Sequence, residues 1–405
     1  MLNPYLLMTL LYAALAILAA LDSSLASFGV LPFLSGLRWF RVHFITLGVV
    51  TESIFGLLAT LVAARAAQPR PATRWDIWAL FNIGLLVLLI GIPLINQPLI
   101  LTGGGLVFAA VVMLLVQLRG LSPSAAPAGG GSRPGRRFYV AGLSFLLLGI
   151  LVGTGLWLGW GEVLRIAVPL EVHIHANNWG FMSLVFAGLL VDLYPGFAGR
   201  AMAWPRSITP IFWMMTIGAL LLVLGPWTQL ILFTVPGIVL HLSATGWLLL
   251  NAIKPLLGDR KAWTTGMLHL VTAYVWLVLP VLVAPLIILG VPGFPGAGVE
   301  QTAPQGLIYG WVLQFGFALV PYLFRRAFVP SQPATLGGSR LSLATVALGA
   351  IALWLSIFLK DIQPLLQGAA YALWVIALVP FALELWQIAR AGLSRLEAER
   401  LAGPG

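Results

Sequence analysis

Residues 98–118, PLILTGGGLVFAAVVMLLVQL, contain no charged side chain, and Thr102 and Gln117 are their only polar ones. An α-helix rises about 1.5 Å per residue, so this stretch is long enough to cross the roughly 30 Å hydrocarbon core of a bilayer. It predicts a transmembrane helix. The residues on either side then show whether it is an isolated anchor or part of a larger membrane domain.

The rest of the chain is built in the same way. Eleven further apolar stretches are separated by short polar or basic segments, and the sequence therefore predicts about twelve membrane-spanning helices. These eleven are 4–30, 38–64, 76–96, 137–159, 166–193, 207–225, 227–253, 262–290, 304–324, 340–360 and 366–389.

The composition excludes a soluble globular protein. Hydrophobic residues make up 60% of the chain and charged residues only 8%, whereas soluble domains carry roughly 25% charged residues. The predicted fold class is all-α and polytopic, with the lipid bilayer as its main partner. The chain also has no cysteine, which excludes thiolate-bound iron–sulfur clusters, thiolate-ligated haem and c-type haem attachment.

The basic residues predict how the chain is oriented. Of the 22 Lys and Arg residues, all except Arg38, Arg41, Arg165 and Lys360 lie in alternate connections or after the last span. A basic excess marks the cytoplasmic side of a membrane protein. We therefore expect a multi-pass protein of the cell (inner) membrane with both termini in the cytoplasm. The positive net charge follows this pattern and does not indicate nucleic-acid binding.

The longest polar segment divides the predicted helices into two groups. Residues 120–136 are rich in Gly, Pro and Ser, a composition typical of a flexible linker. We expect a single transmembrane domain, 1–395, that consists of a four-helix unit (1–119), this linker and an eight-helix unit (137–395). A short cytoplasmic tail, 396–405, would follow.

An internal repeat relates helices that are four apart. His43 is followed five residues later by Gly48, and His175 is followed at the same distance by Gly180; both segments then continue with Gly-Leu-Leu, at 56–58 and 188–190. The first spacing also occurs at His241–Gly246 and, with glutamine in place of histidine, at Gln305–Gly310. We interpret the pattern as three four-helix units, arranged as three arcs.

All five histidines fall inside predicted spans, where ionisable residues are costly and usually functional. They are the candidate metal ligands: His43, His173, His175, His241 and His269. The first three lie about 8–14 Å below the outer edge of the membrane, on helices two and six. This common depth suits bis-histidine ligation of a haem iron. For His241 and His269, a ligand role and a structural role remain equally open.

Neighbouring residues refine the haem hypothesis. Residues i and i+2 of a helix point about 200° apart, so His173 and His175 would serve two different sites and not one iron. Arg38, Arg41 and Arg165 lie at the outer ends of the same two helices and could pair with haem propionates, the alternative being ordinary interfacial anchors. Glu52, in the middle of the second span, could relay protons or bond a neighbouring helix.

Two of these stretches resemble a known family. Arg38-Trp-Phe-Arg41-Val-His43 resembles the start of helix two in subunit I of the haem–copper oxidases, where arginines precede a low-spin haem ligand. The stretch from His173 to Phe181, HIHANNWGF, is similar to the His-x-His-x4-Gly-Trp stretch in helix ten of the C-type oxidases and nitric oxide reductases. A looser likeness, in helix number and scarcity of histidine, is to the NnrS family of membrane haem–copper proteins of the nitric oxide response.

The resemblance implies one or two haem b groups. His43 and His175 would hold a low-spin haem, and His173 would be the axial ligand of a second, five-coordinate haem. Here the motif lies on helix six, and neither a His-His pair nor a set of three copper ligands is present. Copper is therefore an alternative that the ligand set disfavours.

The functional expectation is electron transfer, or binding or reduction of O2 or NO, by an oxidoreductase of the haem–copper oxidase type. Electrons would come from quinol or from a cytochrome-bearing subunit. Two alternatives remain open: a non-catalytic haem protein that senses or sequesters NO, and a permease with a histidine-lined path.

Overall fold

The computed structural model describes residues 3–30, 37–121 and 134–401; of residues 37, 38, 134 and 399 it describes the backbone alone. The chain packs into two compact units: unit 1 comprises Met1–Gly56 and Asp259–Gly405, and unit 2 comprises Leu57–Gly258. The predicted linker at 120–136 falls within unit 2, and most of it lies outside the described residues. The packing therefore divides the chain within the second span and after the eighth.

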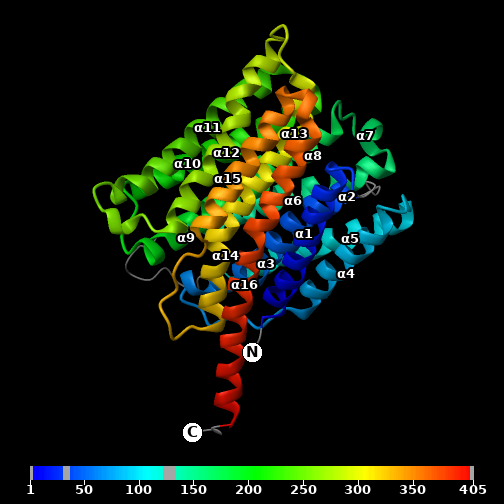
Figure 1. The fold of residues 1–405 in the computed structure, drawn as a ribbon. Helices are drawn as coiled ribbons and strands as arrows, with labels where there is room; N and C mark the ends of the chain where they lie inside the picture. Colours follow the sequence, from blue (N-terminus) through cyan, green and yellow to red (C-terminus); the bar gives the residue numbers. More distant parts are fainter. Residues whose placement is uncertain (1–2, 31–36, 122–133, 402–405) are drawn as a thin grey trace. The chain divides into compact units, whose positions relative to one another are not determined.

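Every regular element in the described part of the chain is helical (Figure 1). The elements of unit 1 are α1 (Pro4–Ser27), α2 (Leu37–His43), η1 (Phe44–Thr51), the first residues of α3 (Glu52–Arg65), η5 (Arg260–Ala262), α12 (Thr265–Ile288), α13 (Gly296–Leu307), η6 (Ile308–Leu313), α14 (Gln314–Phe328), α15 (Arg340–Phe358), η7 (Lys360–Ile362) and α16 (Gln363–Leu401).

Unit 2 contains the remainder of α3 and the helices that follow it. These are α4 (Trp75–Gly91), α5 (Gln97–Gly120), α6 (Pro134–Leu158), α7 (Trp160–Val163), α8 (Pro169–His175), η2 (Ala176–Met182), α9 (Ser183–Ala198), η3 (Pro205–Ser207), α10 (Ile208–Thr228), α11 (Ile231–Ile253) and η4 (Lys254–Leu256).

The predicted all-α polytopic fold is confirmed. Within the described ranges, 11 helices are long and apolar enough to cross a membrane, and the remaining predicted span is the shorter apolar helix α4, with 17 residues. The helix ends agree with the sequence-based limits to within a few residues, with two exceptions: the tenth span begins earlier, at Gly296, and the last is longer at both ends, Lys360–Ala398. Helix α16 continues through the first part of the predicted tail, and Figure 1 shows its C-terminal end extending past the other helices of unit 1.

The second, sixth and tenth spans share a feature that the sequence did not reveal. Each contains a π-helical segment, η1, η2 or η6, and these are also the three most buried of the 11 spans. A π-helical turn accommodates one extra residue in an α-helix and occurs frequently at functional sites. The three segments lie at the same place in the predicted repeat, immediately after or close to His43, His175 and Gln305.

The repeat glycines explain why the spacing recurs. Gly48, Gly180 and Gly310 each lie within a π segment. A Cβ atom at any of them would overlap an aromatic ring of the preceding span: Tyr12, Phe145 and Trp276, in that order. The same glycine–aromatic contact at three equivalent positions supports the threefold repeat. The spacing at His241–Gly246 does not belong to it, because α11 is regular there and a Cβ atom added at Gly246 would have no neighbour within 4 Å.

Candidate functional site

The three histidines expected to bind haem lie beside π segments. His43 is the last residue of α2 and belongs to unit 1, whereas His173 and His175 end α8 and belong to unit 2. Each unit therefore carries its own candidate ligands. The predicted pairing of His43 with His175 joins the two units and stays a prediction.

His43 is positioned by its own helix. Its Nδ1 atom lies 2.8 Å from the carbonyl oxygen of Trp39, one turn earlier. The imidazole also stacks on the Trp39 indole, with ring centroids 4.1 Å apart and planes 14° from parallel. Both contacts depend on the i, i+4 spacing of the two residues, which places them on one face of α2. The i, i+4 spacing of Trp39 and His43 is visible in the sequence, but the sequence analysis considered only hydropathy and the positions of the histidines.

His173 lies against helix α6. Its Nδ1 atom is 2.8 Å from the carbonyl oxygen of Gly149. A Cβ at Gly153 would be only 2.6 Å from the imidazole, so the absence of a side chain there makes room for the ring. Asn177 donates a hydrogen bond of 2.8 Å to the backbone carbonyl of His173 and fixes the turn below it. Helix α6 therefore provides a glycine-lined notch for this imidazole.

His175 faces a different helix. Its Nδ1 atom lies 2.6 Å from the carbonyl oxygen of Leu222 on α10. His173 and His175 therefore point to α6 and α10, the divergence predicted from their spacing along the helix. These two residues cannot serve one iron.

The three carbonyl contacts favour one tautomer. A carbonyl oxygen only accepts hydrogen bonds, so Nδ1 is the donor in these contacts of His43, His173 and His175, although the Asn177 amide nitrogen also lies 3.3 Å from His173 Nδ1. The lone pair is then on Nε2. A metal-bound histidine typically has this arrangement, with its second nitrogen donating to a carbonyl that orients the ring. All three rings are also only partly buried. They fit haem iron in donor type and in orientation.

His241 and His269 show the opposite pattern. The Nε2 atom of His241 lies 3.2 Å from the carbonyl oxygen of Trp179, and that of His269 lies 3.1 Å from the carbonyl oxygen of Ser339. Their Nε2 atoms therefore act as donors. The two side chains are 2% and 0% exposed, and they belong to unit 2 and unit 1 respectively. For both residues this geometry favours the structural alternative over the ligand role.

The candidate propionate partners differ from one another. Arg41 is 6% exposed; it donates to Ser23 Oγ at 2.9 Å and to Gln305 Oε1 at 3.1 Å. Its guanidinium also lies 4.6 Å from the centre of the Tyr371 ring, and the Tyr371 hydroxyl donates to the same Gln305 oxygen at 2.7 Å. Arg41 is therefore anchored inside unit 1, by partners that the sequence analysis did not identify.

The other two arginines are not anchored in this way. Arg165 is exposed just after α7, in a left-handed backbone conformation with φ 51°. The side chain of Arg38 lies outside the described residues. Neither position therefore strengthens the predicted propionate role.

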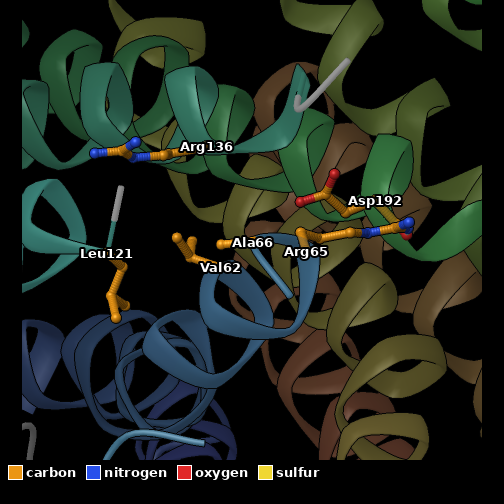
Figure 2. Close-up of a pocket in the computed structure, with 6 residues that line it drawn as sticks. All are labelled: Val62, Arg65, Ala66, Leu121, Arg136 and Asp192. Carbon is orange, nitrogen blue, oxygen red and sulfur yellow. The ribbon is translucent and has the colours of Figure 1, made fainter. Parts of the chain in front are cut away.

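A small pocket in unit 2 is separate from the histidines. It lies between the ends of α3, α5, α6 and α9 and is lined by Val62, Arg65, Ala66, Leu121, Arg136 and Asp192 (Figure 2). Asp192 accepts a hydrogen bond of 2.9 Å from the Tyr139 hydroxyl, and Arg65 donates to the backbone carbonyl of Asp192. These bonds tie three helices together, which indicates a structural role for the carboxylate.

Across the described ranges, no group of three or more His, Asp or Glu side chains is arranged to hold a metal ion. A bare zinc or copper ion requires about three or four protein ligands, whereas haem iron needs only one or two. The residues present therefore suit haem better than a bare metal ion. No protein-family model matches the chain, and a search of curated proteins gives no match.

Proposed function

We propose that this chain is a membrane haem protein in which His43, His173 and His175 supply the iron ligands. The observation that carries the proposal is the common orientation of the three rings. In each, Nδ1 donates to a backbone carbonyl and Nε2 holds the lone pair. Coincidence is a poor explanation, because the other two histidines of the chain have the reverse arrangement.

The cofactor proposed is haem b, in one or two copies. Bound haem supplies an iron that exchanges single electrons and, where one axial position stays open, binds O2 or NO. His173 is the residue proposed for the open site, as the resemblance to the haem–copper oxidases implies. Its opposed orientation to His175 means that the two residues would ligate different irons. Arg41 contributes a fixed positive charge two residues before His43. Such a charge stabilises the reduced iron electrostatically.

The activity proposed is electron transfer or the binding or reduction of a diatomic gas, with quinol or a cytochrome-bearing subunit as donor. The resemblance of the stretches around His43 and His175 to the haem–copper oxidases supports this choice. Copper is not part of the proposal, since the described residues offer no set of three ligands for it. We also propose that the protein resides in the inner membrane with both termini in the cytoplasm.

The test is a visible absorption spectrum of the purified protein, together with its iron and haem content. We expect a Soret band, and reduced haem content in His43→Ala, His173→Ala and His175→Ala. His241→Ala and His269→Ala are matched controls: they remove equally membrane-embedded imidazoles and should retain haem in whatever fraction folds. Absence of a Soret band from the intact protein, after expression with ample haem, would exclude the proposal and favour a permease.

A second measurement separates an oxidoreductase from a protein that only senses or sequesters gas. The dithionite-reduced protein is mixed with NO or O2 under single-turnover conditions. Reoxidation of the haem with consumption of the gas indicates catalysis. A stable ferrous–NO spectrum indicates the non-catalytic alternative.

A further inference from the structure

Glu52 is the most deeply placed carboxyl group of unit 1. It is 0% exposed and directly follows the π segment η1, near the middle of the second span. At 1.5 Å per residue it lies about 14 Å from His43 and about 20 Å from Arg65, where the helix ends on the basic side of the membrane. An ionised carboxylate at this depth costs several kcal/mol. The neutral acid is therefore the favoured resting form.

The first residue after the π segment is polar in all three repeats. Ser183 follows η2 and Gln314 follows η6, just as Glu52 follows η1. All three residues are almost fully buried, at 0–1% exposure. Ser183 and Gln314 can neither gain nor lose a proton in this environment, so only the first repeat places a titratable group at this position. The helix geometry after a π segment therefore does not require a carboxyl group at this position.

A pair of hydroxyl groups connects α1 with α3 at the residue that follows Glu52. Ser53 Oγ lies 3.1 Å from Thr9 Oγ1 on α1, and both side chains are at most 1% exposed. At rest, Thr9 donates to the carbonyl of Tyr5 at 3.1 Å and Ser53 donates to the carbonyl of Val49 at 2.7 Å. If either hydroxyl rotates away from its carbonyl acceptor, it can donate a hydrogen bond to the other hydroxyl. Proton transfer between the two side chains requires this movement.

The same interface brings a titratable neighbour to Glu52. Tyr12, one turn beyond Thr9 on α1 and 0% exposed, packs against Gly48 of η1, one helical turn before Glu52. The other titratable or charged groups on elements packed against η1 are Tyr5 and Asp22 on α1, Tyr309 on η6, and Arg41 and His43 on α2. Across the repeat, Gln314 on α14 is neutral and donates to Thr272 at 2.5 Å.

We propose that Glu52 is a proton-binding site inside the membrane and that the hydroxyl pair formed by Thr9 and the adjacent Ser53 carries its protons. The resting carboxylic acid releases its proton to become the carboxylate, and return of a proton re-forms the O–H bond. The site goes beyond haem binding and does not require it. It would serve any activity of this chain that couples charge movement to protons.

Infrared spectroscopy of the full-length protein in lipid vesicles tests the proposal directly. We expect the carboxylic acid C=O band of the intact protein to diminish in Glu52→Gln and to shift but persist in Glu52→Asp. The matched control is Glu384→Gln. Glu384 is half-buried and forms an ion pair with Arg325 at 2.6 Å, so its replacement should leave this band unchanged.

Exchange into D2O then tests the route. The Glu52 band should shift as the acid exchanges, and Thr9→Val and Ser53→Ala should each slow that shift by about tenfold, the effect of roughly 1.4 kcal/mol on a barrier. A band whose intensity is unchanged in Glu52→Gln overturns the proton site. An exchange rate that is unchanged in both hydroxyl variants overturns the route. If Glu52→Gln does not fold, the shift in Glu52→Asp decides the assignment.

Discussion

His43 stacks on Trp39 of the preceding helical turn and donates its Nδ1 proton to the Trp39 carbonyl, so one residue orients the imidazole through both its ring and its backbone. The carbonyl contact would survive any substitution of Trp39, but the stacking would not. The two contributions can therefore be separated by mutation.

Trp39→Leu should weaken haem binding at His43, whereas Trp39→Phe should retain most of it. Aromatic pairs contribute about 0.5–1.5 kcal/mol beyond the area they bury, which corresponds to roughly a two- to twelvefold loss of affinity in the leucine variant. Haem titration of the apoprotein measures this loss, and electron paramagnetic resonance reports the ring orientation. Equal affinities in the two variants would show that the carbonyl alone positions His43.

Gly153→Ala should displace His173, because the new methyl group would lie 2.6 Å from the imidazole. We expect loss of the haem associated with His173 and an unchanged spectrum for any haem held elsewhere. Gly105→Ala is the control: Gly105 lies in a spanning helix and has no neighbour within 4 Å of the added Cβ. A normal spectrum in Gly153→Ala would mean that the ring can move and still bind.

Gly180→Ala should destabilise the sixth span, since its Cβ would overlap the Phe145 ring. Overpacking a well-filled site costs about 1–3 kcal/mol. Thermal unfolding in detergent measures the change, and Phe145→Ala in the same chain should recover part of the loss. Additive losses in the double variant would contradict the proposed ring contact.

Gln305→Leu should destabilise unit 1, because it removes the acceptor that Arg41 and Tyr371 share. Hydrogen bonds to charged groups contribute about 1.5–3 kcal/mol, and we expect a loss of this size. In a double-mutant cycle, Gln305→Leu should cost much less when Arg41 is already leucine. Equal costs of Gln305→Leu with and without Arg41 would contradict the shared hydrogen bond.

The absence of native cysteine makes the orientation easy to test. Thr228→Cys, at the exposed end of α10, should react with a membrane-impermeant maleimide added to intact cells. Ala398→Cys, on the exposed end of α16, should react only after the membrane is opened. The reverse labelling pattern would invert the orientation inferred from the basic residues.

The sequence was sufficient for the helices but not for their interruptions. Apolar length and the positions of Arg and Lys predict spans directly, because the bilayer requires both. The extra residue in η1, η2 and η6 leaves no mark in hydropathy, and only the recurring His–Gly spacing hinted that these helices are equivalent. The start of the tenth span was missed because residues 296–303 contain glutamate, glutamine and threonine; in the structure Val299, Thr302 and Ala303 are buried, and the glutamate and glutamine are exposed.

For the candidate site, spacing predicted that His173 and His175 diverge, since that follows from helix geometry alone. Depth in the membrane set His43 apart from His269, but it could not decide between a ligand role and a structural role for His269. The distinction comes from which ring nitrogen meets a carbonyl, and that depends on contacts such as His269 with Ser339, 70 residues away. The anchoring of Arg41 by Gln305 is equally long-range.

Each π segment also changes the direction in which the side chains after it point. One extra residue turns everything after Thr51, Met182 and Leu313 by about 100° relative to an uninterrupted helix. Deleting a single residue from η1 would thus leave the span long enough for the bilayer but swing Ser53 away from Thr9 on α1. Evolution of a sequence with this architecture can therefore redirect a polar face through a one-residue insertion, without altering any residue of that face.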